Sequence, residues 1–409
     1  MIKLTSIIKR RPEDIVLAAK RRLFLFRERN FRFRRFSKNQ QQGINLAAYI
    51  RAEMGLGQAA RGIATALESA DIPFNILNFE SGNRSRHGDM SWAHKEVADS
   101  DYDVTIIVVN PDNIFNARSR LPNKIFLNRY VIGYWFWELP NVPDEWLEAF
   151  SLVNEVWAAS RFLHDAVALK CPVPVIHVPP VVEVRNGQSF PRRYFNLPEE
   201  RFLFLVMCDT GSVFERKNPL AAIAAFKKAF APDDPNVGLV VKISGPANRP
   251  PNWDLIQEHV QGHQNIRLID RLLTPEELSS LLAVTDCLIS LHRSEGFGLV
   301  PAEFMSLGKP VIATKWSGNT DYMTADNSFG IDYRLVQLEK DYGPYEAGQY
   351  WAEPDIAQAA HWMKQVSVDP ELAQRVGRAG QQTIRTTFSP QAVGEIISKR
   401  LSYVRDKYR

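Results

Sequence analysis

Two glutamates, Glu295 and Glu303, are separated by seven residues in the stretch EGFGLVPAEFMSLGKPVIAT. The apolar run at 286–291 predicts a strand before them, and Pro301 suits the first turn of a helix after them. The loop between them should therefore lie at the carboxyl end of a parallel strand, where open α/β sheets bind ligands. Alone, each glutamate is better explained as a helix-end charge or a solvated acid. Their combination with two loop glycines and Pro301 favours a ligand site.

Two neighbouring cations, Arg216 and Lys217, occur in ERKNP, between a predicted strand at 202–208 and a predicted helix. Cations at such a place can neutralise the charge that develops on a departing diphosphate. Two solvated surface cations would be the commoner explanation for this dipeptide by itself.

Two further stretches carry weaker signals. In EMGLGQAARG, Gly55 and Gly57 should form a strand-to-helix turn with room for donor phosphates or an acceptor. In GYWFWELPNVPDEW, Trp135 and Trp137 could stack on a sugar ring, and Glu138 could accept a hydrogen bond from an acceptor hydroxyl. Such an aromatic cluster is more often core. We find no H-x-x-H or C-x-x-C string, and no D-x-D string that suggests a metal, so we expect neither a metal nor another cofactor.

The elements that must position these residues alternate regularly along the chain. Continuous apolar runs of strand length are separated by helical segments in both halves, which is typical of parallel sheets covered on both faces. We expect a basic segment over 1–42, an N-terminal domain over 43–180 and a C-terminal domain over 181–387. The proline-rich stretch 171–184 should be the hinge. A C-terminal helix over 388–409 can cross back to the N-terminal domain.

Composition restricts the class of protein. Apolar residues make up 45% and charged residues 23% of the 409 residues, which is usual for globular proteins of two domains. Cys171, Cys208 and Cys287 are isolated, which favours reduced thiols in the cytoplasm. The longest apolar runs are far shorter than a membrane span, and the N-terminus lacks the pattern of a secretion signal.

The net charge of +4 is unevenly distributed, because residues 1–42 hold 13 Lys and Arg against three Asp and Glu. The rest of the chain is therefore net negative, which disfavours nucleic acid as a partner. Within 12–36, apolar residues at helical spacing alternate with arginines, a pattern that suits the surface of an anionic membrane. A solvated tail or a subunit contact together explain it equally well. We expect a cytoplasmic protein that can attach peripherally to the inner face of the membrane.

The long string quoted first, followed by SGNTDYM, resembles the E-x7-E signature of retaining glycosyltransferases of family four. The resemblance extends over about 43–400 and includes the glycine-rich turn, the hinge, ERKNP and RVGRAGQQTIRTTFS in the same order. It implies the α/β GT-B fold, in which two Rossmann-like, doubly wound domains face a central cleft.

The resemblance also implies roles for single residues. Glu295 would bind hydroxyls of the donor sugar, Glu303 the nucleotide ribose and Lys217 the diphosphate. In the same family, backbone amides at four positions complete the donor site, with the first two on the sugar and the last two on the diphosphate: Phe297, Gly298, Leu299 and Val300.

This chain departs from the family pattern at one place. The family usually has an arginine several residues before the lysine, where this sequence has Gly211 or Ser212. Arg216 is the candidate substitute. Contacts to the base should lie near 268–273.

The implied function is transfer of a sugar, with retention, from a nucleotide diphosphate donor to a hydroxyl of a glycan or lipid-linked glycan in cell-surface polysaccharide synthesis. A GDP-sugar such as GDP-mannose is preferred over a UDP-sugar. The alternatives are a nucleotide-sugar epimerase of similar fold, which needs no acceptor, and a non-catalytic nucleotide-sugar binding subunit.

Overall fold

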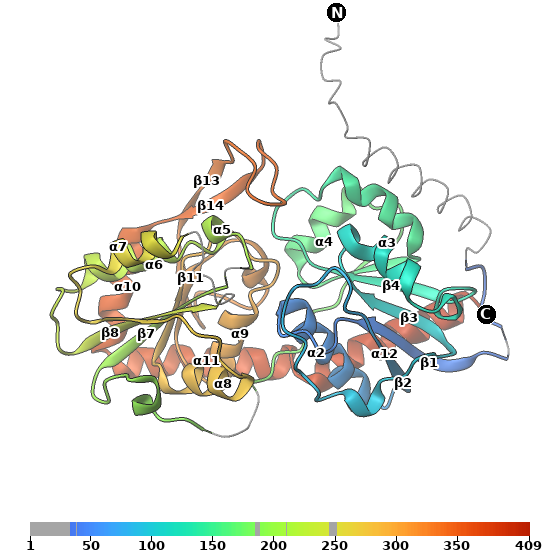
Figure 1. Cartoon of the computed structure of the whole chain (residues 1–409), viewed down its shortest axis with the longest axis horizontal. Coiled ribbons are helices and arrows are strands. Elements are labelled where there is room, and N and C mark those ends of the chain that lie inside the picture. The colour runs from blue at the N-terminus through green and yellow to red at the C-terminus, as the bar shows by residue number, and fades with distance from the viewer. Residues whose placement is uncertain (1–32, 38, 185–188, 210, 245–251) are drawn as a thin grey trace, which may run out of the picture.

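The computed structural model describes residues 33–37, 39–184, 189–209, 211–244 and 252–409. Most of the basic segment, and with it most of the amphipathic pattern, lies outside these ranges. Within them, two six-stranded parallel sheets are each covered by helices on both faces, side by side in Figure 1. The predicted fold class is thus confirmed.

The N-terminal sheet has the strand order β2-β1-β3-β4-β5-β6. Its strands are β1 (Gln41–Ala48), β2 (Phe74–Asn78), β3 (Tyr102–Val108), β4 (Tyr130–Trp135), β5 (Glu155–Ala158) and β6 (Val175–His177). Its α-helices are α2 (Gly55–Ser69), α3 (Pro111–Arg120) and α4 (Arg161–Ala168). Short 3-10 helices are η2 (Ala93–Lys95), η3 (Asn123–Ile125) and η4 (Asp144–Leu152). The order reverses at β1 and β3, so a crevice is expected at their carboxyl ends.

The C-terminal sheet has the order β12-β11-β10-β7-β8-β9. Its strands are β7 (Phe202–Asp209), β8 (Val237–Ser244), β9 (Ile266–Ile269), β10 (Cys287–Ser290), β11 (Val311–Thr314) and β12 (Phe329–Ile331). Its helices are η5 (Arg192–Phe195), α5 (Phe214–Lys217), α6 (Pro219–Ala229), α7 (Trp253–Val260), α8 (Pro275–Val284), α9 (Leu299–Ser306), η6 (Ser317–Asp321), α10 (Ile356–Val368) and α11 (Pro370–Thr387).

Burial on both faces explains the unbroken apolar runs. Along β1, Ile44 and Leu46 pack into the core under α2, whereas Ala47 packs into the core on the other face. A strand with two apolar surroundings needs no polar alternation.

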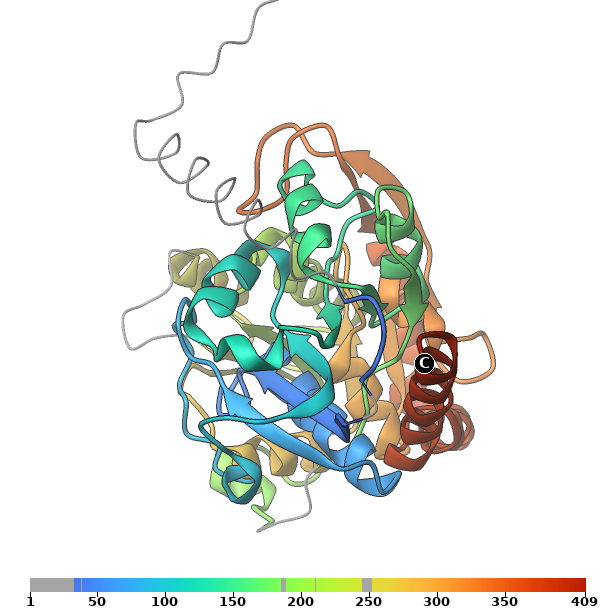
Figure 2. The same ribbon diagram turned by 90° about the vertical axis from the view of Figure 1, so that its right-hand side faces the viewer.

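The last helix, α12 (Pro390–Lys407), packs on the N-terminal domain. Its apolar residues Val393, Ile397 and Leu401 join the core beneath α2. Gly394 permits this approach, since a Cβ there would lie 2.6 Å from the carbonyl oxygen of Ala66. Figure 1 shows α11 and α12 following each other from one domain to the other, and Figure 2 shows the chain ending against the N-terminal domain.

One element has no counterpart in the sequence analysis. Strands β13 (Tyr333–Gln337) and β14 (Tyr350–Pro354) form an antiparallel hairpin, which we call with its loop the interdomain arm (333–354). It projects from the C-terminal domain in Figure 1. Leu338, Tyr345 and Trp351 belong to the core of the N-terminal domain. Polar residues such as Arg334 and Gln337 interrupt its sequence, so the arm lacks the continuous apolar run used to predict the other strands.

Candidate active site

The loop between β10 and α9 ends in a turn that requires glycine. Gly298 caps α9 with φ of +87°, a left-handed conformation, and a Cβ there would lie 2.7 Å from the Tyr322 hydroxyl oxygen. That hydroxyl donates to the Gly298 carbonyl oxygen at 2.6 Å. The turn aims α9 so that the amides of Leu299 and Val300 lie in its first turn, where the helix itself offers no acceptor. This is a suitable place for an anion.

A second loop fixes the position of Glu295. The Glu295 amide donates to the Ser317 hydroxyl at 2.7 Å, and the Gly318 amide donates to the Glu295 carbonyl at 2.9 Å. The loops approach so closely that a Cβ on Gly318 would lie 2.2 Å from the Gly296 carbonyl oxygen. Ser317 itself has φ of +73°, a costly conformation for a residue other than glycine. A strained backbone residue thus lies where Glu295 is held.

The two cations come from α5, which is tied to the same strand end. Asn218 follows α5 with φ of +51°, and its side-chain amide donates to the Leu291 carbonyl oxygen at 3.0 Å. The Lys217 Nζ consequently lies 2.5 Å from Glu295 Oε1, and Arg216 Nη1 lies 3.2 Å from Glu295 Oε2. The three predicted catalytic residues are brought together at the carboxyl ends of β7 and β10.

The charges of this cluster are coupled. Burial alone would raise the pKa of Glu295, but Lys217 and Arg216 lower it to about 2. Burial alone would lower the pKa of Arg216, yet the carboxylates of Glu295 and Glu138 raise it. Glu295 therefore stays ionised at neutral pH and can accept hydrogen bonds from sugar hydroxyls, but it cannot serve as a proton donor there.

A buried histidine lies beneath the cluster and was not singled out from the sequence. His292 is fully buried, and burial lowers its pKa to about 4, with opposing influences from Glu295 on one side and Lys217 and Arg216 on the other. A neutral imidazole is thus held next to three charged groups at physiological pH.

Glu303, on the first turns of α9, reaches across to the other domain. The Gln58 side-chain amide donates a hydrogen bond to Glu303 Oε1. Gln58 lies near the start of α2, which begins at Gly55, so the two helix starts face each other. Gly55 and Gly57, predicted in the turn before this helix, lie in its first turn. Gly55 is exposed, and a Cβ at this position would meet open space, whereas a Cβ on Gly57 would lie 2.0 Å from the Ala52 carbonyl oxygen. Gly57 therefore serves close backbone packing against Ala52, and its predicted role in making room for a ligand stays a prediction.

The tryptophans predicted on the acceptor side are core residues. Trp135 is 0% exposed and packs on Trp146 and Phe150, and Trp137 is 5% exposed and packs on Trp146 and Tyr345. Neither ring offers a face to a sugar, which corrects that prediction. The commoner alternative, core packing, holds because Trp135 is on the central strand β4 and Trp137, which follows β4, is covered by Trp146 and Tyr345.

The structure also shows where Phe297 and the segment 268–273 lie relative to the α9 turn. The Phe297 ring is buried among Tyr322 and Phe388, so only its backbone can meet a ligand. The segment 268–273 lies at the carboxyl end of β9, on the same edge of the sheet as Glu295. The Ser160 hydroxyl donates to the Gly296 carbonyl at 2.6 Å and joins the domains behind the site.

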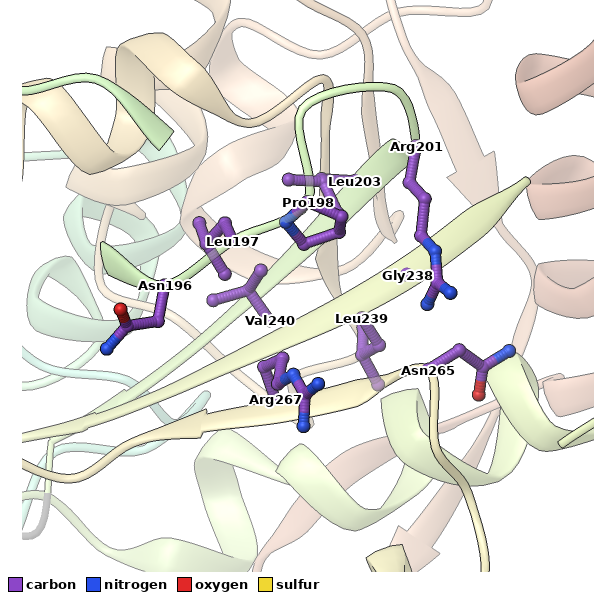
Figure 3. Close-up of a pocket in the computed structure, with 10 residues that line it drawn as sticks. All are labelled: Asn196, Leu197, Pro198, Arg201, Leu203, Gly238, Leu239, Val240, Asn265 and Arg267. Carbon is purple, nitrogen blue, oxygen red and sulfur yellow. The ribbon is translucent and has the colours of Figure 1, made fainter. Parts of the chain in front are cut away.

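Two hollows are formed by residues that the structure describes, one between the domains and one at the opposite end of the C-terminal sheet from Glu295. One of about 530 Å³ lies between the domains, and its lining includes Glu53, Arg86, Asp89 and Glu276. The other, of about 300 Å³, lies against the amino ends of β7, β8 and β9, where Arg201 and Arg267 are among its lining residues (Figure 3). It contains none of the predicted site residues. Among the described residues, no three His, Cys, Asp or Glu side chains cluster so as to hold a metal.

Comparison with known proteins gives a family match for the C-terminal domain. Residues 192–383 match the model of glycosyl transferases group 1. Trehalose synthase of Rubrobacter xylanophilus is 26% identical over 177 residues, which cover 42% of this chain and 37% of the relative. The aligned region thus spans little more than a third of that relative's length.

Solved structures resemble the whole fold. Sucrose-phosphate synthase from Thermosynechococcus elongatus has a TM-score of 0.63 at 14% identity, covering 89% of this chain and 99% of that one. HepE of Anabaena, in complex with UDP and glucose, has a TM-score of 0.57 at 15% identity, covering 88% and 100%. A glycosyltransferase from Rickettsia africae has a TM-score of 0.62 at 12% identity, covering 90% and 99%. At these identities the likeness establishes a shared fold.

Proposed function

We propose, from the family match over 192–383, that this chain is a retaining glycosyltransferase that moves a sugar from a nucleotide diphosphate donor to an acceptor hydroxyl. The observation that carries the proposal is the convergence of Glu295, Lys217 and Arg216 beside the first turn of α9. An ionised acceptor of hydrogen bonds, two cations and free amides are the groups that a sugar diphosphate would need.

In the proposed reaction, the bond between the anomeric carbon and the diphosphate oxygen breaks while the acceptor oxygen attacks from the same face. The acceptor proton passes to the leaving diphosphate. Lys217 and Arg216 stabilise the negative charge that develops on that diphosphate, and the α9 amides share it. Glu295 holds the sugar hydroxyls, and Glu303 holds the ribose.

The donor is proposed to be a nucleotide sugar, with GDP-mannose as the first candidate. HepE was solved with UDP and glucose, so UDP-glucose belongs in the same test.

We propose a glycan or lipid-linked glycan of cell-surface polysaccharide synthesis as the acceptor. The described helices include none that is both long and apolar enough to cross a membrane. We propose peripheral attachment through 1–42 because these residues hold 13 Lys and Arg against three Asp and Glu.

The test is a donor screen with the full chain. Thermal shift with UDP and GDP identifies the base, since a ligand at 100 times its Kd adds about 2.7 kcal/mol of stability. Turnover of the matching sugar nucleotide is then followed with and without glycan acceptors, and NMR of the product's anomeric proton reads the configuration. Retained product that forms only with acceptor supports the proposal. Product without acceptor indicates an epimerase, nucleotide binding without turnover indicates a binding subunit, and inversion contradicts retention.

A further inference from the structure

The interdomain arm brings a tyrosine to the boundary of the candidate active site. The Tyr345 hydroxyl donates to Glu138 Oε2 at 2.9 Å, and the Tyr345 ring packs on Trp137 with 5.2 Å between ring centroids. Tyr345 is 3% exposed. It belongs to the C-terminal domain in sequence, whereas Glu138 and Trp137 follow β4 of the N-terminal domain. The contact therefore crosses the domain boundary.

Glu138 continues the contact to a predicted catalytic cation. Its Oε1 lies 3.9 Å from Arg216 Nη2, and the Arg216 guanidinium lies 6.0 Å from the centroid of the Tyr345 ring. On its other side Arg216 lies 3.2 Å from Glu295 and donates to the Ser294 carbonyl at 2.7 Å. The guanidinium is thus enclosed by two carboxylates, one from each domain, and by the aromatic ring of the arm.

The arm is also tied to the loops that carry the charged residues. Arg293 Nε pairs with Glu353 of β14 at 2.6 Å, and Arg293 Nη1 donates to the Glu215 carbonyl on α5 at 2.6 Å. The Ala352 amide donates to the Arg293 carbonyl at 2.9 Å. A displacement of the arm would consequently move the loop that leads to Glu295 and the helix that carries Arg216.

We propose that Tyr345 and Glu138 are positioning residues that hold the Arg216 guanidinium beside Glu295. This inference rests on the proposed function, in which Arg216 stabilises the leaving diphosphate. The Tyr345 hydroxyl donates its hydrogen bond to Oε2 of Glu138, and Oε1 of the same carboxylate faces Arg216. The carboxylate therefore restrains the cation without withdrawing it from Glu295. Because Tyr345 and Glu138 belong to different domains, the cation is fully restrained only when the domains are together.

The test uses Tyr345→Phe in the full chain, which removes the hydroxyl and keeps the ring against Trp137. Tyr342→Phe is the matched control, because Tyr342 packs on Trp351 in the same arm. We expect Tyr345→Phe to lower kcat about tenfold with little change in the donor KM, the scale of one hydrogen bond to a charged group. The reason is that the cation acts mainly as charge develops on the leaving group. Tyr342→Phe should leave kcat unchanged.

A second measurement does not depend on turnover. Calorimetry with UDP and GDP should give about tenfold weaker binding for Tyr345→Phe, since the product diphosphate carries the developed charge. In the Arg216→Lys background, Tyr345→Phe should add little to either loss. The inference is wrong if the losses caused by Tyr345→Phe and Arg216→Lys add fully in the double variant, or if Tyr345→Phe leaves kcat and nucleotide binding unchanged. Either result leaves the proposed function standing. A wild-type chain that neither binds these nucleotides nor turns over their sugars would overturn the proposed function and the inference with it.

Discussion

Glu295 is kept ionised by two cations and is held in place by its backbone contacts, and this arrangement separates its role from that of Glu303. Glu295→Ala should lower kcat/KM at least about 100-fold, the scale of one preorganised electrostatic contact. Glu303→Ala should mainly weaken nucleotide binding, because Glu303 faces Gln58 and not the cations. Steady-state kinetics and calorimetry on both variants check this. Wild-type turnover by Glu295→Ala would remove the assigned role.

Lys217 offers a test that separates chemistry from folding. Its side chain is about a quarter exposed, and removing a partly exposed cation costs little stability unless it leaves a buried charge behind. Arg216 still pairs with Glu295 in Lys217→Ala, so we expect a folded protein with almost no transfer activity. Thermal unfolding and turnover are measured on the same preparation. A loss of activity that merely follows a lower Tm would make Lys217 structural.

His292 predicts a pH dependence of stability. Its pKa falls from an ordinary 6.5 to about 4 in the folded chain, so between these pH values the unfolded state binds the extra proton. Stability should therefore be complete above pH 6.5 and decline as pH falls towards 4, by about 3 kcal/mol from this group. Glu295, Lys217 and Arg216 are the charged groups that influence it. Denaturant unfolding at several pH values should show a flatter dependence for His292→Asn, and parallel curves for the two proteins would contradict the prediction.

Sequence patterns locate some of these residues better than others. Glu295 and the cations follow strand ends, and Glu303 lies in the helix that follows the Glu295 loop, so the order of elements along the chain brings them to one edge. Ser317 is within the quoted SGNTDYM, yet its left-handed backbone is not visible in a motif. Gln58 and Tyr345 act across the domain boundary, and no local periodicity encodes which domain surfaces meet.

At the scale of elements, α12 is fastened to the N-terminal sheet by a buried ion pair. Glu155 on β5 is 0% exposed and accepts hydrogen bonds from the Tyr130 hydroxyl at 3.0 Å and from Trp157 Nε1 at 2.7 Å. Arg400 of α12 supplies the opposite charge through its guanidinium, with Nε at 3.0 Å from Oε1. The carboxylate therefore depends on α12 for its neutralisation.

Arg400→Met should destabilise the protein by about 3–5 kcal/mol, because it leaves an uncompensated buried charge. The double variant Arg400→Met with Glu155→Gln should recover much of that loss, since the remaining amide can still meet Tyr130 and carries no charge. Denaturant unfolding of the wild type and the two variants gives the comparison. Equal losses in both variants would show that packing, not charge, fastens the helix.

Elements were predictable to different degrees for a physical reason. Strands such as β3 and β7 are covered on both faces and leave unbroken apolar runs. The arm buries a few side chains against another domain and exposes the rest, so its strands have no such run. Trp135 and Trp137 were difficult to assign for another reason. Aromatic residues are common both in cores and on sugar-binding surfaces, and only the packing around β4 and the segment after it distinguishes the two.

At the scale of the whole molecule, the described end of the basic segment is attached to the N-terminal domain. Phe33 and Phe36 pack on Tyr130 and Tyr408, and the Phe36 amide donates to the Tyr408 carbonyl at 2.9 Å. Arg34 and Arg35 are exposed beside the end of α12. The first described residue, Phe33, therefore lies against the N-terminal domain beside the end of α12.

The membrane proposal is tested by removing residues 1–32, because a chain that starts at Phe33 keeps the aromatic contacts. The full chain should float with vesicles containing anionic lipid at low salt and dissociate at high salt, since each nearby cation adds about 1 kcal/mol. The shortened chain should bind much less. Equal flotation of both chains, or binding indifferent to salt, would exclude this segment as an electrostatic anchor.

The return of α12 to the N-terminal domain has a consequence for synthesis on the ribosome. The first sheet is complete at His177, yet the helix that covers part of its face begins only at Pro390. At ~5–20 residues per second, the ribosome needs roughly 10–40 s to make the chain between them. Throughout this interval the nascent N-terminal domain presents uncovered apolar surface and the unneutralised carboxylate of Glu155. Chaperones that hold nascent chains would meet this domain at that surface, and its folding ends after that of the domain made second.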